Sequence, residues 1–439
     1  MKWVLLVLGS GALAFHWAQI VVRGRGDFPN HWEFGRRILA GDWIYEGGLN
    51  FVYPPFWALA HAPLTVVGPH LAQVAGYPLA PLSIAVLLWV LHRLSLDHVP
   101  LDRARLFWAT SLAVVLASPF LLRDLTEIGV NTMLVALSWL AILLWCQKRD
   151  VLAGVSLGLA AALKCTPVLF IAYFALKRQW RFVLASLASL AVFSVLPVFA
   201  QGPDQYVRTL AAWADAVVRG VTEPDPSRGV LGEDKVGNLS LRPAMARYLM
   251  RLPPRHRGRP ETSDSAERPH GPPTPLYLHV GSLPPFWAGV VVKTTMGFLL
   301  LGVGWLFRAK VHERQEFSLL WECATVSLLI LLFSPITWRQ HAVGVLPALY
   351  LICRAGLSGW SRPVWVVSAV AVYTVSCVLL NRGFLGRDLI LLLDSYHVKT
   401  VGICALTLAT LGCRNILLTS HPSVSSGRWR VRGLFGGRG

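Results

Sequence analysis

Residues able to perform acid–base chemistry or bind anions recur in an otherwise apolar sequence. Asp27 stands in "RGRGDF", directly after the first long apolar run. A carboxylate there could take the proton from a hydroxyl group as a general base. The plainer interpretation is a solvated loop carboxylate, which a lone Asp favours.

Lys164 lies between two short apolar runs in "GLAAALKCTPVLF". An ammonium group at this depth is costly unless it reaches the surface or is paired with an anion. A break before Pro167 would also leave free backbone N–H groups at a helix start, and these favour a phosphate nearby. Anion binding and snorkelling to the surface are therefore both open.

Two further motifs carry candidate substrate ligands. In "VGNLSLRPAMARYL", Arg242 could clamp a phosphate, or it could form an ordinary surface ion pair. In "SPITWRQHAV", His341 opens an apolar run and could bond to a sugar or phosphate, or share a proton near neutral pH. Beside Trp338, it could equally be a common residue of the membrane boundary.

The elements that must position these residues are membrane helices. The 439 residues are 54% hydrophobic and only 15% charged, unlike an ordinary soluble domain. We predict an all-α polytopic membrane protein with about twelve transmembrane helices. The first apolar run is expected to be a retained helix, because it lacks a convincing small-residue cleavage site and is followed by many more spans. The expected spans are 3–22, 71–90, 106–122, 131–146, 151–163, 167–176, 182–200, 287–307, 317–333, 342–353, 364–380 and 398–417.

Positive charge predicts the orientation of these helices. Basic loops mark the cytoplasmic side, and they occur at 92–105, 147–150, 177–181, 308–316 and 354–362. The alternate segments then lie outside, and they carry the candidate residues: 23–70, 123–130, 164–166, 201–286, 334–341 and 381–397. Four arginines in the first outer segment run against the rule: Arg23, Arg25, Arg36 and Arg37.

We expect one membrane domain, 1–421, followed by a basic cytoplasmic tail, 422–439. Its large outer loop, 201–285, contains a charged, proline-rich stretch at 252–275 that is predicted to be a disordered linker, because it cannot bury a core.

Other functional classes fit the sequence less well. The net charge of +18 could suggest nucleic acid, but the basic residues lie in loops and in the tail, so we expect no nucleic-acid partner. The seven cysteines show no metal-binding spacing and are expected to be small core residues. A transporter or flippase of a lipid-linked sugar would place its ionisable residues near the bilayer midplane. In this sequence these residues are expected at helix ends instead. The hypothesis of a non-catalytic scaffold that binds anionic lipid is supported only by the basic tail.

The order and spacing of the motifs resemble the polyprenyl-phosphate-dependent mannosyltransferases of glycosyltransferase family 87, in the C-type superfamily. The likeness runs from about Asp27 to about Leu351. It rests on "DF", "GDWIYEGG", "YPP", "IGVN" ending at Asn131, the Lys164 segment, "GNLSLR" with Asn238, and "SPITWRQH".

This resemblance implies transfer of a hexose, usually mannose, from a polyprenyl phosphate to an acceptor hydroxyl on the non-cytoplasmic face. The anomeric centre is inverted, Asp27 is the base, and neither a metal nor another cofactor is required. Lys164, Arg242 and His341 would face the donor phosphate. Asn131, Asn238 and Trp338 are expected to complete the substrate site.

The resemblance also implies the partners and the location. The partners are a polyprenyl phosphate sugar donor, a lipid or glycan acceptor and membrane lipids, and the location is a bacterial plasma (inner) membrane. The chain departs from the family at Ile128 and Gly129, where members often have Gly-Gln. It also has Trp-Arg-Gln-His at 338–341 in place of a Trp-Asp-His-His type of motif. These departures leave the acceptor open.

Overall fold

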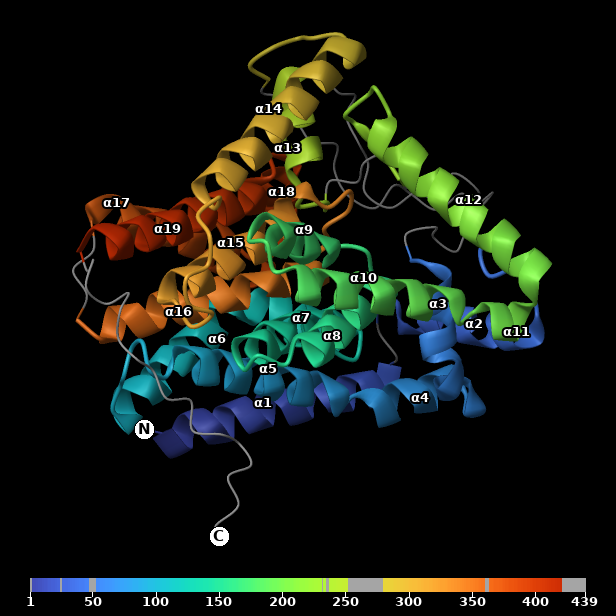
Figure 1. Cartoon of the computed structure of the whole chain (residues 1–439), viewed down its shortest axis with the longest axis horizontal. Helices are drawn as coiled ribbons and strands as arrows, with labels where there is room; N and C mark the ends of the chain where they lie inside the picture. Colours follow the sequence, from blue (N-terminus) through green and yellow to red (C-terminus); the bar gives the residue numbers. More distant parts are fainter. Residues whose placement is uncertain are drawn as a thin grey trace.

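The computed structural model of the chain describes residues 2–23, 26–46, 53–230, 232–233, 237–251, 279–359 and 363–420. The regular secondary structure of the described chain is almost entirely helical, as predicted (Figure 1). Its only strands are the antiparallel pair β1 (Arg228–Gly229) and β2 (Gly232–Glu233). The predicted linker 252–275 and the predicted tail 422–439 lie outside the described residues.

The first half of the chain contains α1 (Lys2–Arg23), α2 (Phe28–Ala40), α3 (Pro55–His61), η1 (Ala62–Val66), α4 (Pro69–Gly76), α5 (Leu79–Ser95), α6 (Arg103–Leu125), α7 (Val130–Cys146), α8 (Asp150–Leu163), α9 (Val168–Leu176), α10 (Trp180–Val195), α11 (Val198–Gln201) and α12 (Pro203–Thr222). The second half contains α13 (Leu241–Leu249), α14 (Pro285–Leu306), α15 (Phe317–Phe333), η2 (Arg339–Val345), α16 (Leu346–Leu357), α17 (Val364–Tyr373), η3 (Thr374–Leu379), α18 (Arg382–Ser395) and α19 (Val398–Ser420).

Each predicted span coincides with one helix or with two consecutive helices. Among the described residues, four helical stretches are long and apolar enough to cross a bilayer: Pro69–Ser95, Arg103–Leu125, Trp180–Gln201 and Pro285–Leu306. A bent pair, Leu389–Ser395 with Val398–Ile416, would make a fifth. The chain is therefore a membrane protein, and the number of twelve crossings stays a prediction.

The break inside the predicted region 151–176 falls where the sequence suggested. Helix α8 ends at Leu163, Lys164 is extended with φ −154° and ψ 124°, and α9 begins at Val168. The prediction of two helices in the region 151–176 is confirmed. Lys164 is thus carried on an extended link between two helix ends, which leaves its side chain free to turn toward neighbouring helices.

Close packing against α10 fixes the position of α8. A Cβ added at Gly154 would lie 2.4 Å from the Cβ of Ala185, and one added at Gly158 would lie 2.6 Å from that of Ser189. Because both positions lack side chains, the two helices approach closely, a packing typical of small residues four apart in membrane helices. This contact holds the end of α8 that carries Lys164.

The centre of the bundle is formed by α7, α15 and α16 together with α6. Trp139 on α7, Trp321 on α15 and Tyr350 on α16 are completely or almost completely buried. Helix α15 buries side chains along nearly its whole length, as expected of a helix that is apolar all round. Helices α7 and α15, which line one side of the pocket described below, are therefore closely packed in the bundle.

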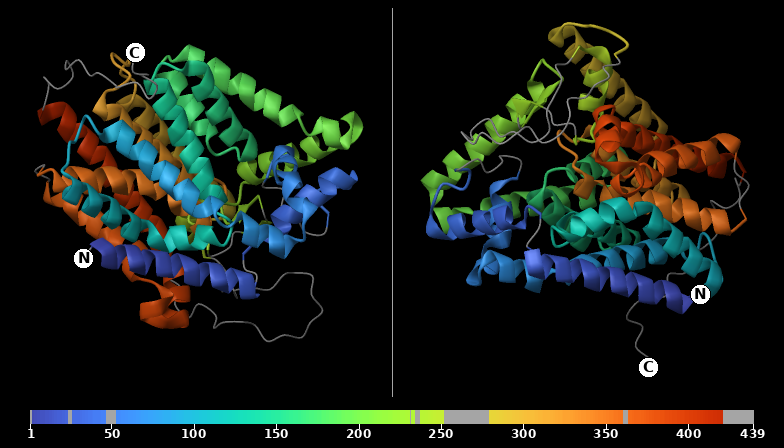
Figure 2. Two further views of the ribbon diagram at one scale, coloured as in Figure 1. Left: turned by 90° about the horizontal axis from the view of Figure 1, so that it is seen from below. Right: turned by 180° about the vertical axis from the view of Figure 1, so that it is seen from behind.

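A layer of short helices, α2, η1, α3 and α4, covers one end of the bundle. Helix α2 buries Phe28, His31, Phe34 and Ile38, which are spaced along one helical face. Figures 1 and 2 show α2, α3 and α11 at the end of the molecule opposite the N terminus. This layer lies over the ends of α7 and α8, next to the break at Lys164.

Two of the arginines that oppose the charge rule lie on the polar face of α2. Arg36 and Arg37 both bond to Glu33, at 2.9 Å and 2.7 Å, and Arg36 also lies 3.5 Å from Asp42. Their charge is neutralised within the layer. They are therefore weak indicators of membrane orientation.

Candidate active site

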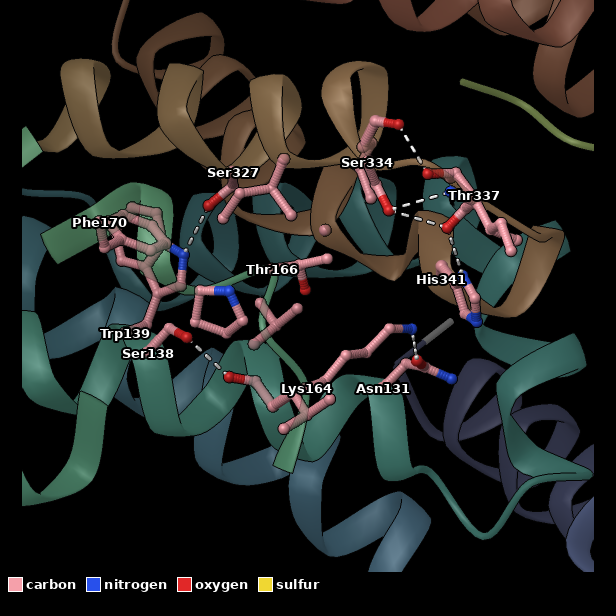
Figure 3. Close-up of a pocket in the computed structure, with 17 residues that line it drawn as sticks. Asn131, Ser138, Trp139, Lys164, Thr166, Phe170, Ser327, Ser334, Thr337 and His341 are labelled. Atoms are coloured by element: carbon pink, nitrogen blue, oxygen red, sulfur yellow. Dashed lines mark hydrogen bonds between the residues drawn. The ribbon is translucent and has the colours of Figure 1, made fainter. Parts of the chain in front are cut away.

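A pocket lies between α7, the α8–α9 link, α15 and the segment that precedes α16 (Figure 3). Its empty space, including the part that is open to solvent, is about 520 Å³. It is lined by Asn131, Leu134, Val135, Ser138, Trp139, Lys164, Thr166, Pro167, Phe170, Ser327, Ile330, Leu331, Ser334, Ile336, Thr337, His341 and Gly344.

The two ends of the pocket differ in character. Lys164, Asn131 and His341 gather at one end, whereas Trp139 and Phe170 lie at the other (Figure 3). The pocket thus offers a cation and hydrogen-bonding groups beside an apolar wall. Such a pocket suits a ligand that has an anionic group joined to an apolar one.

Lys164 is the cation of this pocket. Its Nζ donates to Oδ1 of Asn131 at 3.2 Å and lies 5.9 Å from the centroid of the Tyr53 ring. Burial lowers the pKa of Lys164 to about 7, although the charge of Asp124 acts in the opposite sense. An anionic ligand would favour the charged ammonium and would in turn be stabilised by it.

Asn131 is held in position by Asp124, a carboxylate only 1% exposed. Asp124 Oδ1 accepts from Nδ2 of Asn131 at 2.8 Å, and Oδ2 accepts from the backbone amide and the hydroxyl of Thr132 at 2.8 and 2.7 Å. These bonds satisfy free N–H groups at the start of α7. They also fix the Asn131 amide so that its oxygen faces Lys164.

His341 presents a hydrogen-bond donor to the pocket. The backbone N–H of Trp338 lies 3.1 Å from Nδ1 of His341, and the carbonyl oxygen of Ile336 lies 3.3 Å from the same atom. In the tautomer in which Nδ1 accepts from Trp338, Nε2 carries the hydrogen. Nε2 is buried and has no hydrogen-bond partner among the described residues. Burial and the charge of Lys164 keep the pKa of His341 well below its usual range. In that tautomer the ring is a neutral donor whose Nε2–H is available to a ligand.

Asp27 does not line this pocket. It is exposed, and it precedes α2 without capping that helix through its side chain. Its backbone amide donates to both carboxylate oxygens of Glu127, at 2.8 and 3.0 Å. Glu127 and Asn131 belong to one short segment at the α6–α7 turn, so Asp27 and Lys164 bond to residues only four apart.

Two other predicted residues support the pocket wall. The side chain of Asn238, 1% exposed, donates to the carbonyl of Pro335 at 3.1 Å and accepts from the amide of Thr337 at 2.9 Å. Trp338 supplies the amide that orients His341. Asn238 therefore braces the pocket-lining segment instead of facing the pocket itself.

Arg242 is not brought to the pocket. Its buried guanidinium donates to the carbonyls of Gly220 at 2.5 Å, Asp225 at 2.9 Å and also Arg228. It holds the turn after α12 to the start of α13. These contacts favour a structural role, and the predicted phosphate contact of Arg242 stays untested.

The structure also explains one departure from the family pattern. Gly129 has φ +72°, and a Cβ there would lie 2.4 Å from Cα of Ala80. A glutamine at this position would be strained and would clash with the start of α5. Glycine is thus required by the local packing of the α6–α7 turn.

Sequence reasoning assigned no individual role in the site to Tyr53 or Asp124. Tyr53 stacks on Trp57, with ring centroids 4.3 Å apart, and its ring lies below the Lys164 ammonium. The signal for Tyr53 was its place in "YPP", and that for Asp124 was an acid seven residues before Asn131. Neither signal reveals a contact without the fold.

Within the part of the chain that the structure describes, no group of three or more His, Cys, Asp or Glu side chains is arranged to hold a metal ion. The expectation that the reaction needs no metal stays a prediction.

Comparison with known proteins identifies the family. The model of "Glycosyltransferase family 87" matches residues 51–335, more than half of the chain. Two similar proteins are named polyprenol-phosphate-mannose-dependent alpha-(1-2)-phosphatidylinositol mannoside mannosyltransferases. The one from Mycobacterium tuberculosis is 29% identical over 80% of this chain and 72% of its own length. The one from Mycolicibacterium smegmatis is 26% identical over 77% and 70%.

The matched stretch includes Asn131, Lys164, Asn238 and Arg242, whereas Asp27 and His341 lie outside it. The chain belongs to glycosyltransferase family 87 and is a membrane enzyme that transfers glycosyl groups.

Proposed function

We propose that the chain transfers a mannosyl group from a polyprenyl phosphate to a hydroxyl group of a lipid or glycan acceptor, with inversion, at the non-cytoplasmic face of a bacterial plasma membrane. The observation that carries this proposal is the two-ended pocket: a cation and a free N–H donor beside apolar walls. A polyprenyl phosphate sugar has the matching chemistry, because an anionic phosphate joins a sugar to an apolar chain. The names of the two relatives support the same donor.

Asp27 acts as the base in this proposal. Its carboxylate takes the proton of the acceptor hydroxyl, the oxygen forms a bond to the anomeric carbon, and the bond from that carbon to the phosphate oxygen breaks. A base on the face opposite the leaving group produces inversion. The exposed position of Asp27, beside the segment that carries Asn131, supports this role.

Negative charge grows on the phosphate as it leaves. Lys164 and the Nε2–H of His341 can stabilise that charge, and Asn131 holds Lys164 in place. Phosphate is a good leaving group, so the site needs cations and donors there more than a general acid.

The proposal is tested with purified protein in lipid nanodiscs, radiolabelled polyprenyl phosphate mannose and phosphatidylinositol mannosides as the acceptor. We expect a labelled glycolipid whose new linkage, determined by NMR, has the anomeric configuration opposite to that of the donor. GDP-mannose as the donor is the control and should give no product. Transfer from GDP-mannose alone, or retention of the configuration, would contradict the proposal.

A further inference from the structure

Glu127 is a buried carboxylate that has no role in the proposed transfer reaction. It is 2% exposed and lies in the turn between α6 and α7. Both of its oxygens accept a hydrogen bond from the backbone amide of Asp27, at 3.0 and 2.8 Å. A buried acid that binds the backbone of a candidate base deserves a functional explanation, because burying a carboxylate is costly.

We propose that Glu127 is a positioning residue for the base: it holds the Gly26–Asp27 turn and thereby fixes the point at which the Asp27 carboxylate meets the acceptor hydroxyl. This inference rests on the proposed function, in which Asp27 is the base. Glu127 cannot itself be that base, because its carboxylate is buried and both oxygens are engaged by the Asp27 amide.

The turn that Glu127 holds is built to fit against it. Gly26 has φ +83°, and a Cβ there would lie 2.5 Å from Oε1 of Glu127 and 2.9 Å from the carbonyl oxygen of Thr126. Only glycine fits this position, because the positive φ disfavours other residues and because no space is left for a Cβ atom. The turn before α2 and the turn after α6 are therefore pressed together at this point.

The turn that carries Glu127 is itself anchored. Ile128 and Gly129 have consecutive positive φ angles of 50° and 72°, and Gly129 touches the backbone of Ala80. The side chain of Gln73, on α4, donates to the carbonyl of Thr126 at 2.9 Å. Glu127 is therefore presented from a fixed support rather than from a free loop, as a positioning residue requires.

The same support also carries Asn131, which bonds to Lys164. Glu127 thus couples the position of the base to the half of the site that is proposed to bind the donor phosphate. Loss of this coupling should affect the chemical step more than donor binding, because Lys164 and His341 do not depend on the Asp27 turn.

The experiment compares Glu127→Gln and Glu127→Ala with the wild-type full chain, using polyprenyl phosphate mannose and phosphatidylinositol mannosides. Gln keeps one acceptor oxygen and the size of the side chain, whereas Ala removes the contact. We expect kcat to fall on the order of 10- to 100-fold in the Ala variant, because small misplacements of reacting groups carry penalties of this size. The Gln variant should fall between Ala and wild type, and KM for the donor should stay within about twofold of wild type in both variants.

Hydrogen–deuterium exchange gives a readout that does not depend on activity. In peptides covering residues 26–34, the Asp27 amide should exchange at least roughly tenfold faster in Glu127→Ala than in wild type, because its acceptor is gone. Glu33→Gln is the matched control: it removes another outer-layer carboxylate, which bonds to Arg36 and Arg37 and not to Asp27. That variant should leave kcat and the exchange of the Asp27 amide unchanged.

The outcomes separate this inference from the proposed function. If Asp27→Asn is inactive while both Glu127 variants keep the wild-type kcat, the positioning role is wrong and the base assignment stands. A rise in donor KM with kcat unchanged would also overturn it, because Glu127 would then act on donor binding. If Asp27→Asn is fully active, the assignment of the base fails, and faster exchange in Glu127→Ala would then show only a structural clamp, which also rejects the positioning role.

Discussion

The backbone amide of Asp27 donates to both carboxylate oxygens of Glu127, a residue 100 positions away in the sequence. This contact joins the start of the outer helical layer to the α6–α7 turn. Asn131, which bonds to Lys164 in the pocket, lies in the first turn of α7, the helix that follows this turn. The contact therefore connects Asp27, the proposed base, to the segment that carries a pocket residue.

Replacement of Asp27 by Asn should remove the base and leave the fold intact. The backbone amide that bonds to Glu127 is unchanged by this substitution. We expect transfer of radiolabelled mannose to fall by about 10²- to 10⁴-fold, the usual contribution of a general base. Asp42→Asn, which changes an exposed acid of the same layer, is the control. Transfer by Asp27→Asn at near the rate of this control would contradict the role of Asp27.

Replacement of Lys164 by Met should weaken donor binding. The variant keeps the apolar stem of the side chain and loses the ammonium that lines the pocket. A hydrogen bond to a charged group contributes about 1.5–3 kcal/mol, so the dissociation constant of the donor should rise by roughly 10- to 100-fold. Binding of polyprenyl phosphate mannose can be followed by isothermal calorimetry in nanodiscs. Lys293→Met is the matched control, because Lys293 bonds to the carbonyl of Thr222 and not to the pocket. Equal affinities for the two variants would exclude a phosphate contact by Lys164.

Replacement of His341 by Phe should remove a donor that serves the transition state. Phe keeps the ring and loses the free Nε2–H that lies at the polar end of the pocket. We expect kcat/KM to fall on the order of 10²-fold, which is typical of the loss of one donor to a developing negative charge. Steady-state kinetics with varied donor concentration provide the measurement. Unchanged kcat/KM would mean that Nε2–H does not contact the reacting groups.

Replacement of Arg242 by Met should affect stability more than donor binding. The substitution leaves several buried carbonyls, among them those of Gly220 and Asp225, without the guanidinium. Loss of partners for buried polar groups costs about 1–3 kcal/mol for each group, so Tm should fall by several degrees. Thermal unfolding in detergent gives Tm, and calorimetry gives donor affinity. A large loss of donor affinity without a change in Tm would restore the phosphate role predicted from the sequence.

The stability of the protein should depend on the ionisation of Glu127. Burial and the charge of Asp27 raise the pKa of Glu127 from its ordinary value of 4.5 to about 7. The folded state therefore holds a proton that the unfolded state releases between these values, and stability should fall as pH rises through this window. The charged or titratable groups that face Glu127 are Asp27, Tyr53, Arg123 and Asp124.

Glu127→Gln cannot ionise, so its stability lacks this dependence. The difference in Tm between Glu127→Gln and wild type should increase in favour of the variant from pH 5 to pH 8. Differential scanning calorimetry in detergent at several pH values measures it. A constant difference across this range would contradict a raised pKa for Glu127.

The sequence by itself determined the helical membrane class, the family and most helix ends. Long apolar runs can only become helices in a bilayer, because every backbone polar group must be satisfied within the chain. The helix break at Lys164 could also be predicted from the sequence, because Lys164 and, three residues later, Pro167 interrupt an apolar run. The proposed roles of Asp27, Lys164 and His341 came from motifs whose order along the chain resembles that of the family.

Only the tertiary structure decided which of these residues share a site. Asn131, Lys164 and His341 meet because α7, the α8–α9 link and the segment before α16 pack around one pocket, whereas Arg242 is drawn to backbone carbonyls nearby in the chain. The contact between Asp27 and Glu127 has no local signal, because hydrogen bonds between distant segments depend on how helices pack. Periodicity and residue type indicate whether a segment is buried, exposed or in the membrane. They do not indicate which distant segments of the chain it packs against.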